Sequence, residues 1–336
     1  MIMVRSALAF GLALGLAACG AEIEWPRPAG IATEPMAPFP EEIEGGALGE
    51  LVWRGGAFLT FDHAETGPVT GFAVSDDGAR LLAVTASGLW LSAALDYDAD
   101  GALTGASDGW LTPMAGEDGL PLTAGQMPEA LALLPGGRAV ASFATEPMLR
   151  VYALPPDWSG LAEARPQSLP APPGADRWAG TTTLRALAAT DDALWAGLER
   201  ALVDGQSHPV FRYGLDDLDR EPGGHTLRLQ AGYGLAAFAA WGADELIAVE
   251  RFASRNGDRI RLTVVPASAI RPEPGRLPSR PRLLAQTAQP AGLGTIRGAA
   301  VARTGDRERL FVLSSGQAAS GPRAALMSFE LPAREE

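Results

Sequence analysis

The chain has 336 residues, of which 47% are hydrophobic and 20% are charged, with 40 glycines, 27 prolines and one cysteine. This composition excludes a disordered chain and a disulfide scaffold, and its glycine and proline content is too high for a helical bundle. The formal net charge of −13 provides no basic surface for a phosphate backbone, so we expect no nucleic-acid partner. An all-β protein of many short strands joined by turns is favoured.

The N-terminus has the features of a signal peptide. Arg5 precedes an apolar run over residues 7–18 that is too short to be a membrane anchor. The run ends in Leu-Ala-Ala-Cys19, which resembles the lipobox of bacterial lipoproteins, in which the cysteine is lipidated and becomes the new N-terminus. The alternative is an ordinary secretory peptide with an incidental cysteine. We expect residues 1–18 to be removed and Cys19 to attach the protein to a membrane. Because Gly20 follows the cysteine, similarity to enterobacterial sorting favours the outer membrane, with the protein facing the periplasm.

The next segment, residues 19–49, is rich in proline and acidic residues and has no sustained periodicity. It is typical of a disordered tether. No later stretch is long and apolar enough to cross a bilayer. We therefore expect residues 50–332 to form one domain held near the membrane surface.

A pattern of a short apolar strand, a turn and a second, more apolar strand occurs five times. The copies start at residues 70, 129, 185, 236 and 297, so the repeat is 51 to 61 residues long. Each interval has room for a third strand and usually a fourth, and four antiparallel strands are the unit of a β-propeller blade. The alternatives are a two-sheet sandwich or two small barrels, but neither explains a regular repeat of this length.

The pattern therefore predicts a single β-propeller of four-stranded blades. Five blades are visible, and the longer intervals leave room for a sixth. Two apolar segments, residues 51–54 and 57–61, precede the first copy, and we expect them to pair with the last blade and close the ring.

One short motif has carboxylates at alternate positions, as in the first half of a calcium loop: Asp96, Asp98 and Asp100, followed by Gly101. Ser107 stands where a loop of the EF type needs a bidentate glutamate, and the surrounding residues are strand-like. A hairpin turn is the alternative, since Asp and Gly are the usual turn residues.

The repeats themselves are similar to a known family. The segments GFAVSDDGARLLAVTASGLWLSAALDYDADG, PEALALLPGGRAVASF, ELIAVERF and RLFVLSSGQ follow the order of the phytase-like propellers, also described as the domain with esterase-like activity of phytase. The resemblance covers roughly residues 50–332. It implies a propeller with acidic residues at the starts of first strands and the ends of second strands, near the mouth of the central channel. Such acids could hold Ca²⁺ ions that polarise a phosphate and its attacking water.

The resemblance assigns roles to particular residues of this chain. Glu129 matches a glutamate before a first strand, Glu199 and Glu250 match acids after second strands, and Arg251 fits the segment that follows Glu250. Four positions depart from the family pattern, because an aspartate or glutamate would be expected there: Ala86, Arg185, Arg297 and Ser315. A guanidinium cannot coordinate Ca²⁺, and its positive charge opposes a nearby cation.

Two functions follow from this mixture. The first is an envelope lipoprotein with a degraded hydrolase site that acts as a ligand-binding or scaffold protein. The second is a calcium-dependent phosphoric-ester hydrolase in which Glu129, Glu199 and Glu250 act. If Arg185, Arg251 and Arg297 gather at the channel mouth, they either pair with these acids or bind a small anion.

Overall fold

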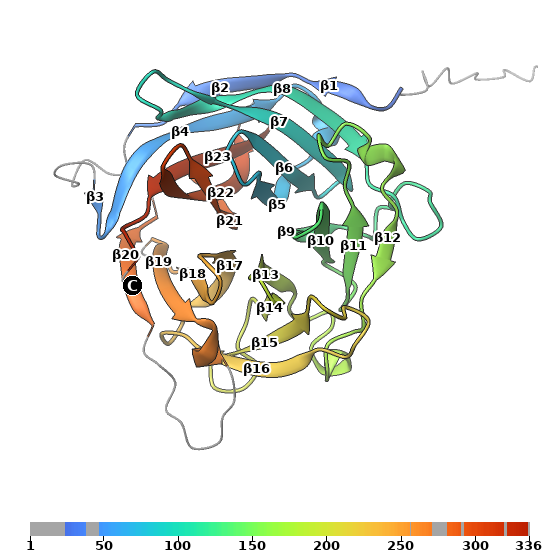
Figure 1. Ribbon diagram of the computed structural model, residues 1–336, viewed down its shortest axis with the longest axis vertical. Helices are drawn as coiled ribbons and strands as arrows, with labels where there is room; N and C mark the ends of the chain where they lie inside the picture. Colours follow the sequence, from blue (N-terminus) through green and yellow to red (C-terminus); the bar gives the residue numbers. More distant parts are fainter. Residues whose placement is uncertain are drawn as a thin grey trace, which may run out of the picture.

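Five four-stranded antiparallel blades are arranged around a central channel (Figure 1). Three blades are separate sheets, whereas the first and last blades are joined into one larger sheet by a parallel contact of their rim strands at Gly55 and Leu103. The computed structural model describes residues 24–37, 47–255, 257–270, 281–289, 292–318 and 321–334. Within each blade one strand borders the channel and the fourth lies at the outer rim. The β-propeller predicted from the repeats is confirmed, and the strands of the described ranges make five blades.

Blades 1 to 4 each take four consecutive strands of the chain. Blade 1 consists of β5 (Val69–Val74), β6 (Arg80–Thr85), β7 (Leu89–Tyr97) and β8 (Leu103–Pro113). Blade 2 consists of β9 (Pro128–Leu134), β10 (Arg138–Phe143), β11 (Leu149–Ala153) and β12 (Pro166–Ser168). Blade 3 consists of β13 (Leu184–Ala189), β14 (Ala193–Leu198), β15 (Ser207–Gly214) and β16 (Gly223–Arg228). Blade 4 consists of β17 (Gly234–Ala240), β18 (Glu245–Phe252), β19 (Arg259–Pro266) and β20 (Arg282–Ala288).

Short 3-10 helices connect some of these strands: η2 (Ala64–Thr66), η3 (Leu161–Glu163), η4 (Ala175–Arg177) and η5 (Ala267–Ile270).

Blade 5 combines strands from both ends of the chain. It consists of β21 (Thr295–Thr304), β22 (Arg307–Ala318), β23 (Gly321–Glu330) and, at the rim, β4 (Leu51–Phe61). β4 runs antiparallel to β23 with Phe58 opposite Ala325, and the two-residue strand β3 (Ala47–Leu48) pairs with β4. The predicted closure is confirmed, with the two expected segments forming one strand. Ring closure removes the open edge that the last blade would otherwise present.

The inner strands pack closely around the axis. Each of β5, β9, β13, β17 and β21 contacts the inner strand of both neighbouring blades. A Cβ added to Gly71 would lie 2.7 Å from backbone atoms of Ala130, and one added to Gly298 would lie 2.7 Å from the ring of Phe72. Small residues are therefore required where the blades meet. The lower channel is narrow, with a volume of about 130 Å³, and its lining includes Ala73, Ala132, Ala188, Ala239 and Ala300.

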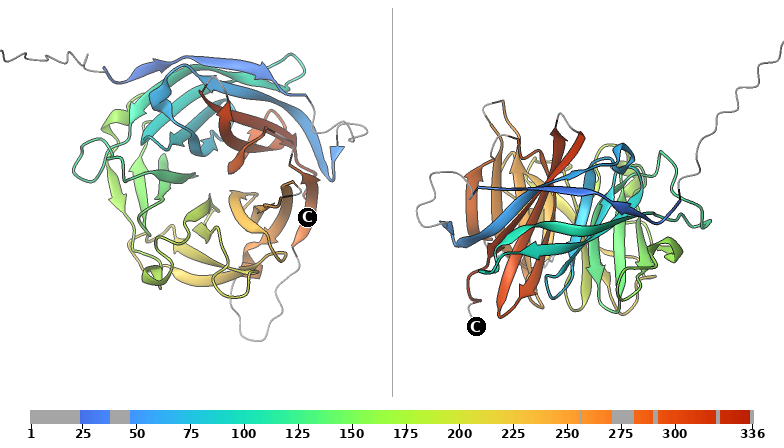
Figure 2. Two further views of the ribbon diagram at one scale, coloured as in Figure 1. Left: turned by 180° about the vertical axis from the view of Figure 1, so that it is seen from behind. Right: turned by 90° about the horizontal axis from the view of Figure 1, so that it is seen from above.

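The N-terminal segment differs from the disordered tether that its composition predicts. β1 (Arg27–Ala29) pairs with β8, and β2 (Ile31–Pro35) pairs with β4, so the segment crosses the rims of blades 1 and 5 (Figure 2). We call β1 and β2 the belt. Proline is accepted in edge strands, and the backbone of the belt satisfies the open edges of β4 and β8. The tether prediction is wrong for the belt, and residues 1–23, including Cys19, lie outside the described residues.

Removing the belt is expected to destabilise the propeller. A chain that starts at Met36 should melt roughly 5 °C below one that starts at Glu24, which corresponds to a loss of about 2 kcal/mol, and should aggregate more readily because two strand edges become exposed. Differential scanning calorimetry and light scattering of the two chains would measure this. Equal melting temperatures would contradict a structural role for the belt.

Candidate functional site at the channel mouth

Every first strand carries one extra residue at the same place. The register between first and second strands shifts by one residue in each blade, which leaves a bulged residue near the start of the first strand. The bulged residues, in blade order, are Thr70, Glu129, Arg185, Ala236 and Arg297. A bulge redirects its side chain relative to the sheet. We call these five residues the bulge ring.

A second set of equivalent positions lies at the ends of the second strands. Each residue of this set pairs through its backbone with the residue two places before the bulge. The set, in blade order, is Ala86, Ala144, Glu199, Arg251 and Ser315. We call it the outer ring. The departures from the family pattern at Ala86, Arg185, Arg297 and Ser315 thus occupy equivalent positions of these two rings.

Three of the five charged residues of the two rings line a cavity at the channel mouth. The cavity has a volume of about 420 Å³ and is formed by blades 3, 4 and 5, with Arg185, Glu199 and Arg251 among its lining residues. His208 and Tyr233 also line it, although no sequence motif assigned a role to either residue. The two ring nitrogens of His208 contact the carbonyl oxygens of Leu198 and Tyr233 at 3.2 and 3.1 Å, and burial lowers the pKa of His208.

Ion pairs connect three blades at this mouth. Nη2 of Arg185 lies 2.7 Å from Oε2 of Glu129, and Nε of Arg185 lies 3.3 Å from Oε2 of Glu199. Nη1 of Arg297 lies 3.9 Å from the same Glu129 oxygen. One carboxylate is therefore shared by two guanidinium groups. Arg185 thus pairs with both Glu129 and Glu199, and Arg297 pairs with Glu129, as one of the two expected arrangements of the mouth.

The pairing leaves arginine donors unused. Nη1 of Arg185 and Nε of Arg297 are buried and have no hydrogen-bond partner among the described residues. The Arg185 side chain is only 10% exposed. Burial, followed by repulsion from Arg185, lowers the pKa of Arg297. Two guanidinium groups therefore face two carboxylates in this cluster, and the site retains N–H groups that no described residue uses.

Arg251 has a partner that the sequence did not suggest. Its guanidinium pairs with Asp258, which directly precedes β19, and this hydrogen bond is the main cause of the lowered pKa of Asp258. No sequence pattern indicated this pair, because Asp258 comes near Arg251 only once the hairpin of β18 and β19 is formed. Arg251 is thus neutralised by a neighbour from its own blade.

Glu250 does not join the mouth. Side chains of consecutive strand residues point to opposite faces, and Glu250 is one residue before the outer-ring position that Arg251 occupies. The carboxyl group is 1% exposed, accepts a hydrogen bond of 2.8 Å from the Thr263 hydroxyl and lies 3.5 Å from Nη1 of Arg261. Burial raises the pKa of Glu250. The structure therefore does not bring Glu250 together with Glu129 and Glu199 at the mouth.

The residues present do not fit a calcium ion. Glu129 and Glu199 are both engaged by Arg185, and the described residues contain no group of three His, Cys, Asp or Glu side chains that could hold a metal. In the motif that resembles a calcium loop, Asp98 accepts backbone N–H bonds from Asp100 and Ala102 at 3.0 and 2.8 Å. Asp96 accepts a hydrogen bond from Ser107 at 2.7 Å. This segment is a hairpin turn between β7 and β8.

The family model of phytase-like proteins, described as "Esterase-like activity of phytase", matches residues 64–315. The chain belongs to the phytase-like family. No curated protein matches the chain in sequence. The phytase-like assignment agrees with the propeller and with the position of the two rings at its mouth. Within the described part of the chain, none of the helices has the length and apolar character needed to cross a bilayer.

Solved structures similar to this phytase-like chain include other propellers. The β-propeller domain of Cps50 (Swd1) from Myceliophteria thermophila is 12% identical, with 89% of this chain and 99% of that chain covered and a TM-score of 0.40. The catalytic domain of a GH62 α-L-arabinofuranosidase from Coprinopsis cinerea is 12% identical, with 90% and 98% covered and a TM-score of 0.47. Virginiamycin B lyase from Staphylococcus aureus is 11% identical, with 90% and 75% covered and a TM-score of 0.36. These similarities concern the fold alone.

The position of Glu250 generates a pH-dependent prediction. Because its pKa is raised in the folded state, the folded protein retains a proton above pH 4.5, where the unfolded chain has lost it. The stability of the parent should therefore fall, relative to that of Glu250→Gln, as the pH rises from 4.5 through the raised pKa. Urea unfolding at pH 4.5 and pH 8 would measure the difference. Glu221→Gln at an exposed site is the matched control, and an equal pH response of Glu250→Gln and the parent would contradict the prediction.

Proposed function

We propose that the protein is an envelope lipoprotein whose propeller binds a small organic or inorganic anion at the channel mouth, instead of hydrolysing a phosphoric ester. The proposal depends on one observation. The charged positions of the two rings hold three arginines and two glutamates, and Arg185 and Arg297 occupy bulged positions of two blades. Where the family pattern has acidic residues that favour a cation, this chain has arginines, which favour an anion.

The chemistry of the mouth supports this proposal. Guanidinium groups offer fixed pairs of donors that match carboxylate and phosphate oxygens, and rigid strands hold them in place. Arg185 and Arg297 retain unused donors, as described above. A cavity of about 420 Å³ accommodates a small ligand such as citrate or phosphate.

The hydrolase remains the second candidate. It is favoured by the family description and by the two acids, Glu129 and Glu199, that stand at ring positions. For hydrolysis, these carboxylates would have to release Arg185 and bind a metal ion such as Ca²⁺ instead. The ion pairs of 2.7 and 3.3 Å make that exchange costly, because the guanidinium would be left buried without a partner.

Anion binding is expected to respond in opposite directions to two charge changes. Arg297→Gln should weaken binding at least tenfold, because it removes a donor and a positive charge, whereas Glu129→Gln should strengthen it severalfold by releasing both guanidinium groups. Isothermal titration with phosphate, citrate and sulfate would measure both effects. Arg220→Gln, at an exposed position of blade 3, is the control. The proposal would be wrong if the parent bound none of the three anions, or if both variants bound them with the affinity of the parent.

The same preparations distinguish the second candidate. We expect no turnover of p-nitrophenyl phosphate above background with millimolar calcium. Calcium-dependent turnover that is abolished by EDTA and by Glu129→Gln would favour the hydrolase instead.

Membrane attachment is a separate part of the proposal and depends on Leu-Ala-Ala-Cys19. The belt begins at Arg27, so only seven residues separate it from Cys19, and they span at most about 25 Å. A lipid on Cys19 would therefore hold the rims of blades 1 and 5 close to the bilayer. Two or three acyl chains make a durable anchor.

Cys19→Ser is expected to abolish lipidation, so that the protein leaves the membrane fraction or stays unprocessed. Fractionation with immunoblotting, together with the mass of the N-terminal peptide, would show this. Ser6→Ala, within the same signal segment, is a control that should behave as the parent. A Cys19→Ser protein that matures and fractionates normally would contradict the anchor.

A further inference from the structure

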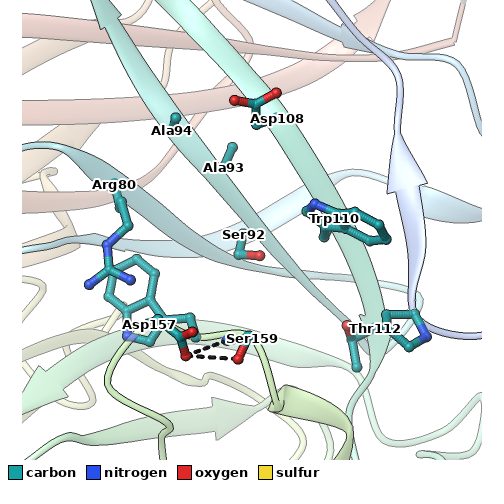
Figure 3. Close-up of a pocket in the computed structure, with 11 residues that line it drawn as sticks. Arg80, Ser92, Ala93, Ala94, Asp108, Trp110, Thr112, Asp157 and Ser159 are labelled. Atoms are coloured by element: carbon teal, nitrogen blue, oxygen red, sulfur yellow. Dashed lines mark hydrogen bonds between the residues drawn. The ribbon is translucent and has the colours of Figure 1, made fainter.

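A second cavity lies far from the channel mouth, at the rim between blade 1 and a loop of blade 2 (Figure 3). Its volume is about 440 Å³. β7 forms its floor with Ser92 and Ala94. β8 contributes Trp110, which lies opposite Ser92, and Asp108, which lies in a bulge opposite Ala93. Pro26, directly before the belt, also lines it. The cavity therefore depends on the N-terminal segment that folds back on the rim.

Two aromatic side chains line this cavity. Trp110 is 46% exposed, which makes it the most exposed tryptophan among the described residues, whereas Trp158 is 7% exposed. The guanidinium carbon of Arg80 lies 4.4 Å from the centroid of the Trp158 ring, and Nη2 of Arg80 donates to the Pro156 carbonyl. An exposed indole offers a large flat apolar surface to a ligand.

The backbone is strained at the same place. Only two non-glycine residues in the described part of the chain have a positive φ, and both line this cavity: Asp108 with φ of 50° and Trp158 with φ of 60°. Such conformations are uncommon for residues with side chains, and they cluster at ligand-binding sites because the surrounding fold has to maintain them. At Asp108 the positive φ coincides with a bulge between β7 and β8, and the side chains of Asp108 and Trp158 line one cavity from two blades.

The polar groups narrow the class of ligand. Arg80 is the one cation of the lining, and Asp108 and Asp157 are its two anions. Oδ1 of Asp157 is occupied by the backbone N–H and hydroxyl of Ser159, which orients the carboxylate. A purely apolar ligand would leave these charged groups desolvated and unpaired, and an anion would meet two carboxylates. A ligand with an apolar face and several hydroxyl groups satisfies both the indole and the carboxylates.

From this arrangement we propose that the rim cavity binds a neutral carbohydrate, with one or two pyranose rings against Trp110 and hydroxyl groups hydrogen-bonded to Asp108 and Arg80. The C–H face of a pyranose packs on an indole, and carboxylate and guanidinium groups accept and donate hydrogen bonds to neighbouring hydroxyls. The volume of about 440 Å³ is that of a small-ligand site. This site is independent of anion binding at the channel mouth.

The test uses the full chain in a zwitterionic detergent without a sugar headgroup. Chitotriose, cellotriose and maltotriose would each be titrated while tryptophan fluorescence and heat are recorded. We expect saturable binding of at least one trisaccharide, and Trp110→Ala should weaken it tenfold or more. Leu120→Ala, which also removes an exposed apolar side chain, is the matched control. Absence of binding by all three sugars, or equal affinity in Trp110→Ala, would overturn the proposal.

A further variant separates binding from folding. Asp108→Gly relieves the positive φ, so its melting temperature should equal or exceed that of the parent, while the affinity for the trisaccharide should fall at least fivefold. Arg297→Gln and saturating citrate should leave the sugar affinity unchanged. An Asp108→Gly protein that binds as tightly as the parent, or displacement of the sugar by citrate, would contradict a separate carbohydrate site.

Discussion

The close approach of five strands around one axis determines most of this structure. Where the blades converge, Gly71 and Gly298 allow neighbouring strands to touch, and the narrow lower channel has a volume of about 130 Å³. At the starts of the same strands the bulge ring redirects one side chain per blade, and long charged groups find room in a cavity of about 420 Å³. The narrow lower channel and the charged mouth are thus two ends of one packing arrangement.

The charges at the mouth are balanced locally, and that balance limits their chemistry. Glu129 is shared by Arg185 and Arg297, and Arg251 is satisfied by Asp258. Carboxylates held in this way are poor ligands for a divalent cation, because each would have to abandon a buried guanidinium. If the mouth binds an anion as proposed, a member of the phytase-like family keeps the propeller while the preferred charge of its ligand reverses. Fold and function separate at a few side chains.

The sequence predicted features that depend on local patterns and missed those that depend on register. Residues 129, 185 and 297, where three of the repeats begin, are bulged positions in the structure. The repeats could be found in the sequence because a strand, a turn and a second strand form from neighbouring residues. Glu250 was grouped with Glu199, but Glu250 lies one residue earlier in its strand than the position equivalent to Glu199, which Arg251 occupies. An offset of one residue reverses the direction of a side chain. The belt was missed because edge pairing uses backbone groups and tolerates proline and acidic residues.

Closure by β4 has a consequence for the order in which the protein folds. β4 is synthesised near the start of the chain, but β23, its partner, is made near the end, and the contact of Arg54 with Glu330 spans 276 residues. Such a long loop closes slowly, so blade 5 should be the last to form. Until then the edge of β4 that pairs with β23 stays open, and the growing polypeptide is exposed to aggregation. If the chain crosses a membrane before it folds, β4 and β23 are both present on the far side of that membrane when blade 5 closes. The time during which β4 is unfolded and lacks β23 would then be short.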